Sequence, residues 1–168
     1  MIACVDVSYG EHRAAAACVL LRSWEAERED RAHLAHLDDV APYQPGAFYL
    51  RELPCILAVL RQVEVPLTAI VIDGYVWLSS DGRPGLGARL FDALDDQVPV
   101  VGVAKTSFHG ADDFAIPLLR GQSKKPLHVT AVGTEPANAA AWVQRMHGPH
   151  RIPTMLQRVD WLCRQANV

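Results

Sequence analysis

The sequence predicts an α/β fold, a mixed β-sheet with helices on both faces. Two observations predict it: the first forty residues contain three strand-like segments in succession, and the rest of the chain alternates between short apolar strands and helices. Successive strands favour antiparallel pairing, whereas strands separated by helices favour parallel pairing. The length of 168 residues and the hydrophobic content of 50% are typical of one globular domain, here residues 1–168, with a core of its own.

The N-terminal strands are expected to form a β-meander. Apolar runs place these strands at 2–7, 15–22 and 32–37. The segment 25–31, which mixes both signs of charge, is expected to be a solvated turn between the second and third strands. A loop at 38–46 then leads into a helix that ends near Gln62.

The remaining residues are expected to alternate between strands and helices and to end in two helices. Strands are expected at 68–72, 98–104, 115–119 and 127–132, and helices at 86–96, 136–146 and 153–166. The last two strands are expected to pair as a hairpin, because the turn-forming segment 121–126 separates them. Each C-terminal helix begins with a proline, whose missing N–H costs nothing in a first turn.

The charge of the chain excludes one class of function. Sixteen Lys and Arg residues against 19 Asp and Glu residues give a net charge of −3 and a pI near 6.1. A protein that coats nucleic acid by bulk charge needs many cations to release counterions, so this class is excluded. A protein that contacts a few phosphates locally is not.

The apolar segments indicate the compartment. The four cysteines are scattered without CxxC spacing and are expected to be buried free thiols in a reducing compartment. The N-terminus does not resemble a signal peptide, and no run of 18 apolar residues exists. We therefore expect a cytoplasmic protein without a membrane span.

Two aspartates lie within or at the end of predicted strands. In one position an ionised side chain costs free energy, and the other position is typical of ligand sites. Asp6 lies between Val5 and Val7 inside the first strand, where an ionised carboxylate is costly unless it is paired or binds a metal. Asp73 ends a buried strand, and open α/β sheets bind ligands outside such carboxyl ends. The alternatives are a hydrogen-bonded core acid for Asp6 and a turn residue for Asp73, which precedes Gly74.

Two more acids are expected in helices. Glu52 precedes Pro54, which is best tolerated in a first turn, so Glu52 is expected near a helix N-terminus, where the helix dipole favours a carboxylate. Asp160 falls on the edge of the apolar stripe of the last helix. The alternatives are an ordinary helix-start residue for Glu52 and a surface pair with Arg151 or Arg158 for Asp160.

Carboxylates that converge on one end of a mixed sheet form an oxygen-only site suited to Mg²⁺, with Mn²⁺ as a substitute. Two such ions about 4 Å apart can activate water and stabilise the leaving oxygen of a phosphodiester. A second charged group, Arg120 with Lys124 and Lys125, surrounds the hairpin turn. It is expected to be a solvated turn, with phosphate contact as the alternative.

The chain resembles the endonuclease V family, nucleases with a ribonuclease H-like fold that act at deaminated, inosine-containing nucleic acid. The resemblance spans most of the chain. It rests on CVDVSY at 4–9, PYQPGAFYLRE at 42–52, VIDG at 71–74, GLG at 85–87, VPVVGVAK at 98–105, PLHV at 126–129 and RIP at 151–153. The second and fifth of these are the specific ones.

The resemblance implies roles for individual residues. It implies that Asp6, Glu52 and Asp73, with Asp160 as a fourth and more variable member, hold the metal, and that Lys105 faces the active site. The implied catalytic residues are therefore Asp6, Glu52, Asp73 and Lys105. Tyr43 and Pro45 would insert into the duplex beside the damaged base, and backbone amides around Gly46 and Gly74 would receive that base. Lys105 would also bind the substrate as a charge on a phosphate.

The chain departs from the family pattern in three places. After Gly74 the family has a histidine-containing turn and then His-Pro-Arg, whereas residues 75–84 contain no histidine. This difference bears on the hydrogen bonding around the scissile phosphate and on the shape of the inosine pocket. Gln44 replaces an aliphatic residue, and the first strand begins at Ile2 without the helix that family members place before it.

The sequence therefore predicts a monomeric, Mg²⁺-dependent DNA-repair endonuclease. It would cleave DNA, or RNA, at the second phosphodiester 3′ to an inosine. Two alternatives stay open. One is a metal-dependent phosphodiesterase of different specificity, and the other is a relative that binds lesioned or structured nucleic acid without cutting it.

Overall fold

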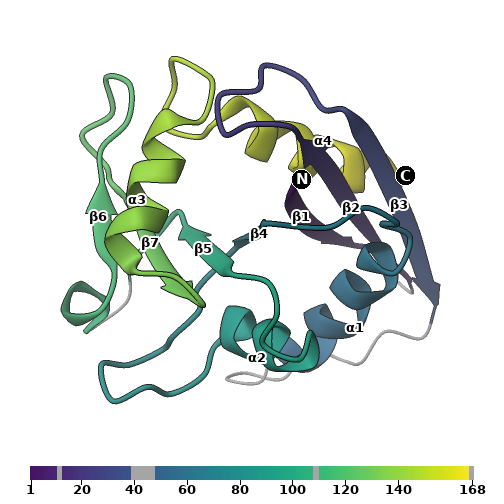
Figure 1. Ribbon diagram of the computed structural model, residues 1–168, viewed down its shortest axis with the longest axis horizontal. Helices are drawn as coiled ribbons and strands as arrows, with labels where there is room; N and C mark the ends of the chain where they lie inside the picture. The colour runs from purple at the N-terminus through teal and green to yellow at the C-terminus, as the bar shows by residue number, and fades with distance from the viewer. Residues whose placement is uncertain (11–12, 39–47, 108–109, 167–168) are drawn as a thin grey trace.

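The computed structural model describes residues 1–10, 13–38, 48–107 and 110–166, which form a seven-stranded sheet flanked by helices (Figure 1). The strands are β1 (Ile2–Tyr9), β2 (Arg13–Leu21), β3 (Arg31–Asp38), β4 (Ala69–Asp73), β5 (Val100–Ala104), β6 (Ile116–Leu118) and β7 (Leu127–Val132). The helices are α1 (Tyr49–Leu60), α2 (Leu86–Ala93), α3 (Pro136–Arg145) and α4 (Thr154–Ala166), with a short 3₁₀ helix at Ala111–Asp113.

The sheet is mixed, as the sequence predicts. Its strand order is β3-β2-β1-β4-β5-β7-β6. The N-terminal meander pairs antiparallel, β1 with β2 and β2 with β3, whereas β1, β4 and β5 are parallel neighbours. The predicted hairpin of β6 and β7 forms, and β7 returns antiparallel to β5. The central parallel strands β1, β4 and β5 therefore have their carboxyl ends at one edge of the sheet.

The helices cover both faces of the sheet. On one face α3 and α4 pack over alternate residues of the strands, such as Ile2 and Cys4 of β1. On the other face α1 and α2 pack over the intervening residues, such as Ala3 and Val5. This alternation fixes which face each strand residue serves.

Several predicted element bounds differ from the observed ones by one to three residues, and two of these differences have a physical reason. The helix expected at 86–96 ends at Ala93, because Asp95 and Asp96 adopt the left-handed conformation, with φ of 54° and 56°. Such a conformation ends a helix, as aspartate tolerates it better than most residues. The strand expected from residue 98 pairs only from Val100 onward, where the parallel ladder with β4 begins.

Arg120 contradicts the expectation of a solvated basic turn. Its side chain is buried at 4% exposure, and its guanidinium donates hydrogen bonds to backbone carbonyls of the α3–α4 connection. The acceptors are the carbonyl oxygens of Met146, Gly148, His150 and Arg151. A buried guanidinium needs hydrogen-bond acceptors. The α3–α4 connection turns back on itself and so presents four carbonyl oxygens to this one side chain. Arg120 therefore joins the β6–β7 turn to this loop.

The charged segment between β2 and β3 is also more than a solvated turn. Glu25 pairs with Arg145 of α3 at 3.1 Å, and Glu29 pairs with Arg158 of α4 at 2.8 Å.

All four cysteines are buried free thiols, as expected. Within the described ranges, no helix has both the length and the apolar character needed to cross a membrane.

Candidate active site

Strand alternation and register bring Asp6, Asp73 and Lys105 to one edge and one face of the sheet. In the parallel ladder Val5 of β1 pairs with Ile72 of β4, so the next residues, Asp6 and Asp73, are neighbours. Asp6 lies two positions after Cys4, and Asp73 lies two positions after Val71. Cys4 and Val71 face α3 and α4, and alternate residues of a strand share a face, so both aspartates lie on that face. Lys105 directly follows β5, two residues beyond Val103, which also faces α4. The three side chains therefore share the α4 side of the carboxyl edge.

Helices bring two further carboxylates to the same edge. Glu52 lies in the first turn of α1, as expected, and is buried at 6% exposure, with no hydrogen-bond partner for its Oε2 among the described residues. Asp160 of α4 is half-buried and accepts a hydrogen bond from Arg164 Nε at 2.9 Å. The alternative pairing of Asp160 with Arg151 or Arg158 is wrong, since Arg158 pairs with Glu29 and Arg151 binds backbone carbonyls.

These side chains surround one open cavity of about 550 Å³. Its lining includes Asp6, Glu52, Asp73, Lys105 and Asp160 together with Tyr9, Phe48, Gly74, Tyr75 and Arg164. The four predicted acids and the predicted lysine, which are far apart in the sequence, therefore meet at one place.

The carboxylates at this cavity repel one another in poorly solvated surroundings. Burial, and then the charges of Asp73 and Asp160, raise the pKa of Asp6 to about 7, against the effect of a hydrogen bond from the Val7 N–H at 2.8 Å. Burial, and then the charges of Asp6 and Asp73, raise the pKa of Glu52 to about 8. The ionised forms of these acids are therefore unfavourable in the folded protein without a cation, and a bound cation would stabilise them.

Lys105 is the cation that the chain itself supplies. Its Nζ lies 2.5 Å from Oδ2 of Asp73. Burial lowers the pKa of Lys105, but the hydrogen bond and charge of Asp73, with further contributions from Asp6 and Asp160, outweigh it and raise the pKa. The lysine is therefore charged and half-exposed at the rim of the cavity, where it can meet an anionic ligand.

The donor set fits a hard divalent cation. All four acids offer oxygen ligands, and the buried Oε2 of Glu52 has no partner among the described residues, as expected for an atom that awaits a ligand. Within the described ranges, no three acidic, histidine or cysteine side chains are already arranged around one ion position. Asp73, which Lys105 binds, is one side chain that would have to change partner to hold a cation.

A second pocket of about 200 Å³ opens beside the carboxylates. It is lined by Phe48, Tyr49, Glu52, Asp73, Gly74, Tyr75, Leu78, Gly85 and Leu86, so its walls are mostly aromatic, aliphatic or glycine. The N–H of Gly74 donates to the Val103 carbonyl at 3.2 Å, so this amide is not free to receive a base. Gly74 instead forms part of the wall. The predicted wedge residues Tyr43, Pro45 and Gly46 lie outside the described residues.

Some residues at the site were not predicted from the sequence. Arg164 lies four residues after Asp160, which is the usual spacing of a helical ion pair, and this signal could have identified it. Tyr75 follows Gly74 and donates its hydroxyl to the Thr106 carbonyl at 2.9 Å. Tyr9 ends β1 beneath the guanidinium of Arg51, whose carbon lies 3.8 Å from the ring centroid. No local signal distinguishes the two tyrosines from packed aromatics.

Sequence comparisons find one family. Residues 1–145 match the family model described as Endonuclease V. The chain is 32% identical over 186 residues to the endonuclease V of Streptomyces coelicolor, which covers 96% of this chain and 77% of that protein.

Solved structures agree with the sequence comparisons. The crystal structure of Streptomyces avermitilis endonuclease V matches with a TM-score of 0.74 at 28% identity, over 98% of this chain and 80% of that chain. Ciona intestinalis endonuclease V, crystallised with a 24mer DNA containing an inosine followed by a ribo-adenosine, matches with a TM-score of 0.84 at 18% identity, over 98% and 84%. The likeness to the Ciona protein concerns the fold, and it confirms the expected ribonuclease H-like architecture.

Proposed function

Because the chain belongs to the endonuclease V family, we propose that it is a divalent-metal-dependent endonuclease that cuts nucleic acid close to an inosine. One observation carries the proposal: four acids from β1, α1, β4 and α4, and the lysine that directly follows β5, converge on a single cavity at the carboxyl edge of the central strands. Converging carboxylates that can hold metal ions, with an adjacent cation, are an arrangement that can catalyse hydrolysis of a phosphodiester.

The proposed mechanism assigns a task to each side chain. Asp6, Glu52, Asp73 and Asp160 would hold Mg²⁺, for which Mn²⁺ can substitute. When bound, the metal supplies Lewis-acid activation of water and of the phosphate. Lys105, half-exposed at the rim, places its ammonium beside the scissile phosphate and neutralises charge that develops there. Substrate and metal would together separate Lys105 from Asp73, because the phosphate attracts the ammonium and the metal attracts the carboxylate.

The pocket beside the carboxylates supports a substrate with an everted base. Its aromatic and aliphatic walls match the flat apolar faces of a base, and Glu52 and Asp73 line both this pocket and the catalytic cavity. An inosine in this pocket would leave a nearby phosphodiester at the carboxylates. The proposed cut is at the second phosphodiester on the 3′ side, with Tyr43 and Pro45 as the wedge. The Ciona relative bound to inosine-containing DNA supports this class of substrate.

The test is cleavage of end-labelled DNA and RNA oligonucleotides with and without one inosine, in Mg²⁺ and in Mn²⁺. The expected product is a single cut at the second phosphodiester 3′ to the inosine, with no cut in the matched strand without inosine. Equal cutting of both strands would reveal a phosphodiesterase of other specificity. A complete lack of products with every substrate would contradict the proposal.

A second function, binding of altered nucleic acid without cutting, is favoured by one feature of the site. Asp73 is already ion-paired with Lys105. Residues 75–84 contain no histidine that could serve in place of Asp73 as a ligand, or as a proton donor. A protein of this kind would retain affinity for inosine-containing strands in a gel-shift assay and yield no products at any metal concentration.

A further inference from the structure

A groove with a volume of about 410 Å³ lies outside the candidate active site. It is lined by Gln122, Ser123, Pro149, His150 and Arg151, and we refer to it as the basic groove. The first two residues belong to the connection between β6 and β7, and the other three to the connection between α3 and α4. The proposed cleavage chemistry uses none of these five residues.

The segments that form the groove carry positive charge only. Residues 114–134 contain Arg120, Lys124 and Lys125 and no acidic residue, although the whole chain has a net charge of −3. Residues 137–159 contain three arginines and two histidines and again no acidic residue. The chain contains three lysines, which are Lys105, Lys124 and Lys125. Arg145 and Arg158 are paired with Glu25 and Glu29, so the positive charge left at the groove comes from Arg120, Lys124, Lys125 and Arg151. These four cations still favour an anionic occupant.

The two loops that form the groove are held firmly together. The buried guanidinium of Arg120 donates to four carbonyls of the α3–α4 connection. Gly121 has φ of +59° and packs against the Pro149 carbonyl so closely that any side chain would collide with it. A groove built in this way exists before a ligand arrives, so binding costs little in ordering the loops.

The groove is joined to the active site through Arg151. One nitrogen of this guanidinium, Nη2, donates both to the Lys105 carbonyl and to the Pro126 carbonyl, the latter at 2.7 Å. The backbone at Lys105 therefore lies next to the backbone at Pro126, which directly follows Lys125. An extended strand of nucleic acid with one phosphate at the Lys105 side chain would reach the groove with a neighbouring phosphate.

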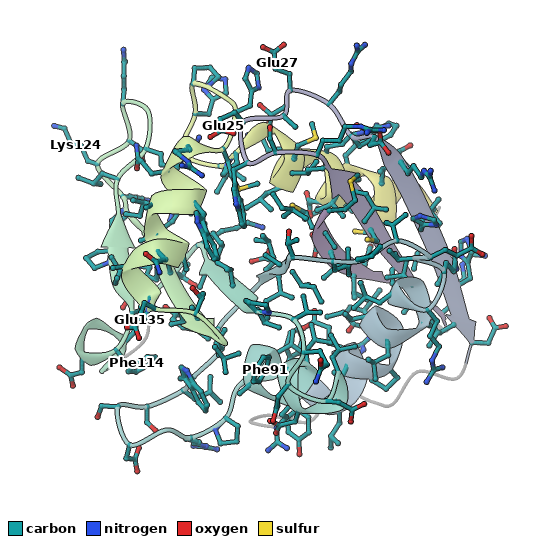
Figure 2. All side chains as sticks on the ribbon, in the orientation of Figure 1. Glu25, Glu27, Phe91, Phe114, Lys124 and Glu135 are labelled. Atoms are coloured by element: carbon teal, nitrogen blue, oxygen red, sulfur yellow. The ribbon has the colours of Figure 1, made fainter. Side chains whose placement is uncertain are left out.

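Lys124 and Lys125 directly follow Ser123 of the groove lining, so they lie beside the groove without lining it. Both are exposed, and neither forms an ion pair with a residue that the structure describes. Ser123 Oγ accepts a hydrogen bond from the Lys125 N–H at 3.1 Å and donates to the Lys125 carbonyl at 3.2 Å, which fixes the turn. Figure 2 shows the side chain of Lys124 pointing away from the body of the molecule.

We propose that the basic groove and the two lysines beside it, Lys124 and Lys125, bind the phosphodiester backbone of the substrate strand beyond the scissile phosphate, with these lysines as the phosphate contacts. Arg151, in this proposal, keeps the groove and Lys105 in fixed register along the strand. The inference rests on the proposed function for the identity of the strand. It adds a binding site that the carboxylates and the base pocket do not provide.

The first test is amine footprinting of the full chain, bound to an inosine-containing oligonucleotide, with a lysine-acetylating reagent and mass spectrometry. The Asp6→Asn variant in Mg²⁺ keeps the strand intact. The expected result is protection of Lys105, Lys124 and Lys125 by at least threefold relative to the free protein. Protection of Lys105 alone would overturn the basic groove and leave the proposed function in place. Protection of Lys124 and Lys125 alone would support the groove and contradict the proposed site, and protection of none would overturn both.

The second test measures binding at several salt concentrations with the double variant Lys124→Ala/Lys125→Ala. Each lost phosphate contact should lower the slope of log K against log salt by about one, so the double variant should lose about two. The matched control is Arg31→Ala/Arg61→Ala, which removes two exposed charges, one at the start of β3 on the opposite edge of the sheet from β6 and one at the end of α1, and should leave the slope unchanged. Equal slopes for the two double variants would overturn the proposal.

Discussion

The Nζ of Lys105 and the Oδ2 of Asp73 lie 2.5 Å apart, so in this structure the lysine of the candidate site binds one of its four carboxylates. The pair is half-exposed, and therefore solvent weakens it and a ligand can separate it. The same lysine can thus stabilise the free carboxylates and bind a phosphate when substrate and metal are present. Several expectations about activity depend on this pair.

Lys105→Ala should slow the cutting step by about 10²-fold, the effect of losing one charge that stabilises a transition state. The same change frees Asp73, so half-maximal activity should require less Mg²⁺ than in the wild type. Single-turnover cleavage rates across a Mg²⁺ titration measure both effects. Lys105→Arg, which keeps the charge, serves as the control and should recover part of the rate. A wild-type rate for Lys105→Ala would remove this residue from the mechanism.

Asp6→Ala should abolish cleavage and leave the fold and the binding of inosine-containing strands largely intact. Asp6 lies at the edge of the sheet on the face toward α4, and the replacement removes a half-buried carboxylate that neighbouring acids repel, rather than a packing group. Cleavage assays, circular dichroism and gel shifts measure the three properties. The control is Asp81→Ala, which removes an exposed acid outside the site. Cleavage at the wild-type rate by Asp6→Ala would contradict the whole metal site.

Much of this site could be predicted from the sequence, because its positions follow from local periodicity. The apolar runs are sufficient to place Asp6 within the first strand and Asp73 at the carboxyl end of another, whereas their adjacency on one face follows from the register of β1 against β4. The first-turn position of Glu52 follows from Pro54. These residues could be predicted because each one's position depends only on the element in which it lies.

Other features could not be predicted, because they depend on contacts between distant segments. The pairing of Lys105 with Asp73 requires the register of β4 against β5, which the sequence of neither strand specifies. Arg120 resembles a solvated turn residue, yet it is buried because the α3–α4 connection folds back and presents four carbonyls to it. A charged residue in a turn gives no local sign of such a partner.

The metal-free protein should lose stability as the pH rises from about 4 to about 8. The pKa of Asp6 rises from its ordinary 3.8 to about 7 on folding, and that of Glu52 from 4.5 to about 8. The folded state therefore binds more protons than the unfolded state in this range. The stabilisation is complete below about pH 4 and is lost as the pH passes through 7 and 8.

The measurement is the free energy of unfolding of the wild type minus that of Asp6→Asn, in EDTA at pH 5 and pH 8. The difference isolates this site from the other titrating groups, and it should shift in favour of Asp6→Asn at pH 8. Mg²⁺ should stabilise the wild type more at pH 8 than at pH 5, since protons compete with the metal. A difference that does not change with pH would mean that Asp6 is not buried among other acids.

Arg120→Ala should destabilise the fold by about 3 kcal/mol, because it leaves several buried carbonyls without donors. Arg145→Ala is the matched control: it removes an exposed arginine whose pair with Glu25 lies in solvent, and it should cost less than about 1 kcal/mol. Urea denaturation followed by tryptophan fluorescence measures both. Arg120→Ala should also weaken nucleic acid binding, since the loops of the basic groove lose their common anchor. Equal free energies of unfolding for the two variants would show that the hydrogen bonds of Arg120 do not hold these loops.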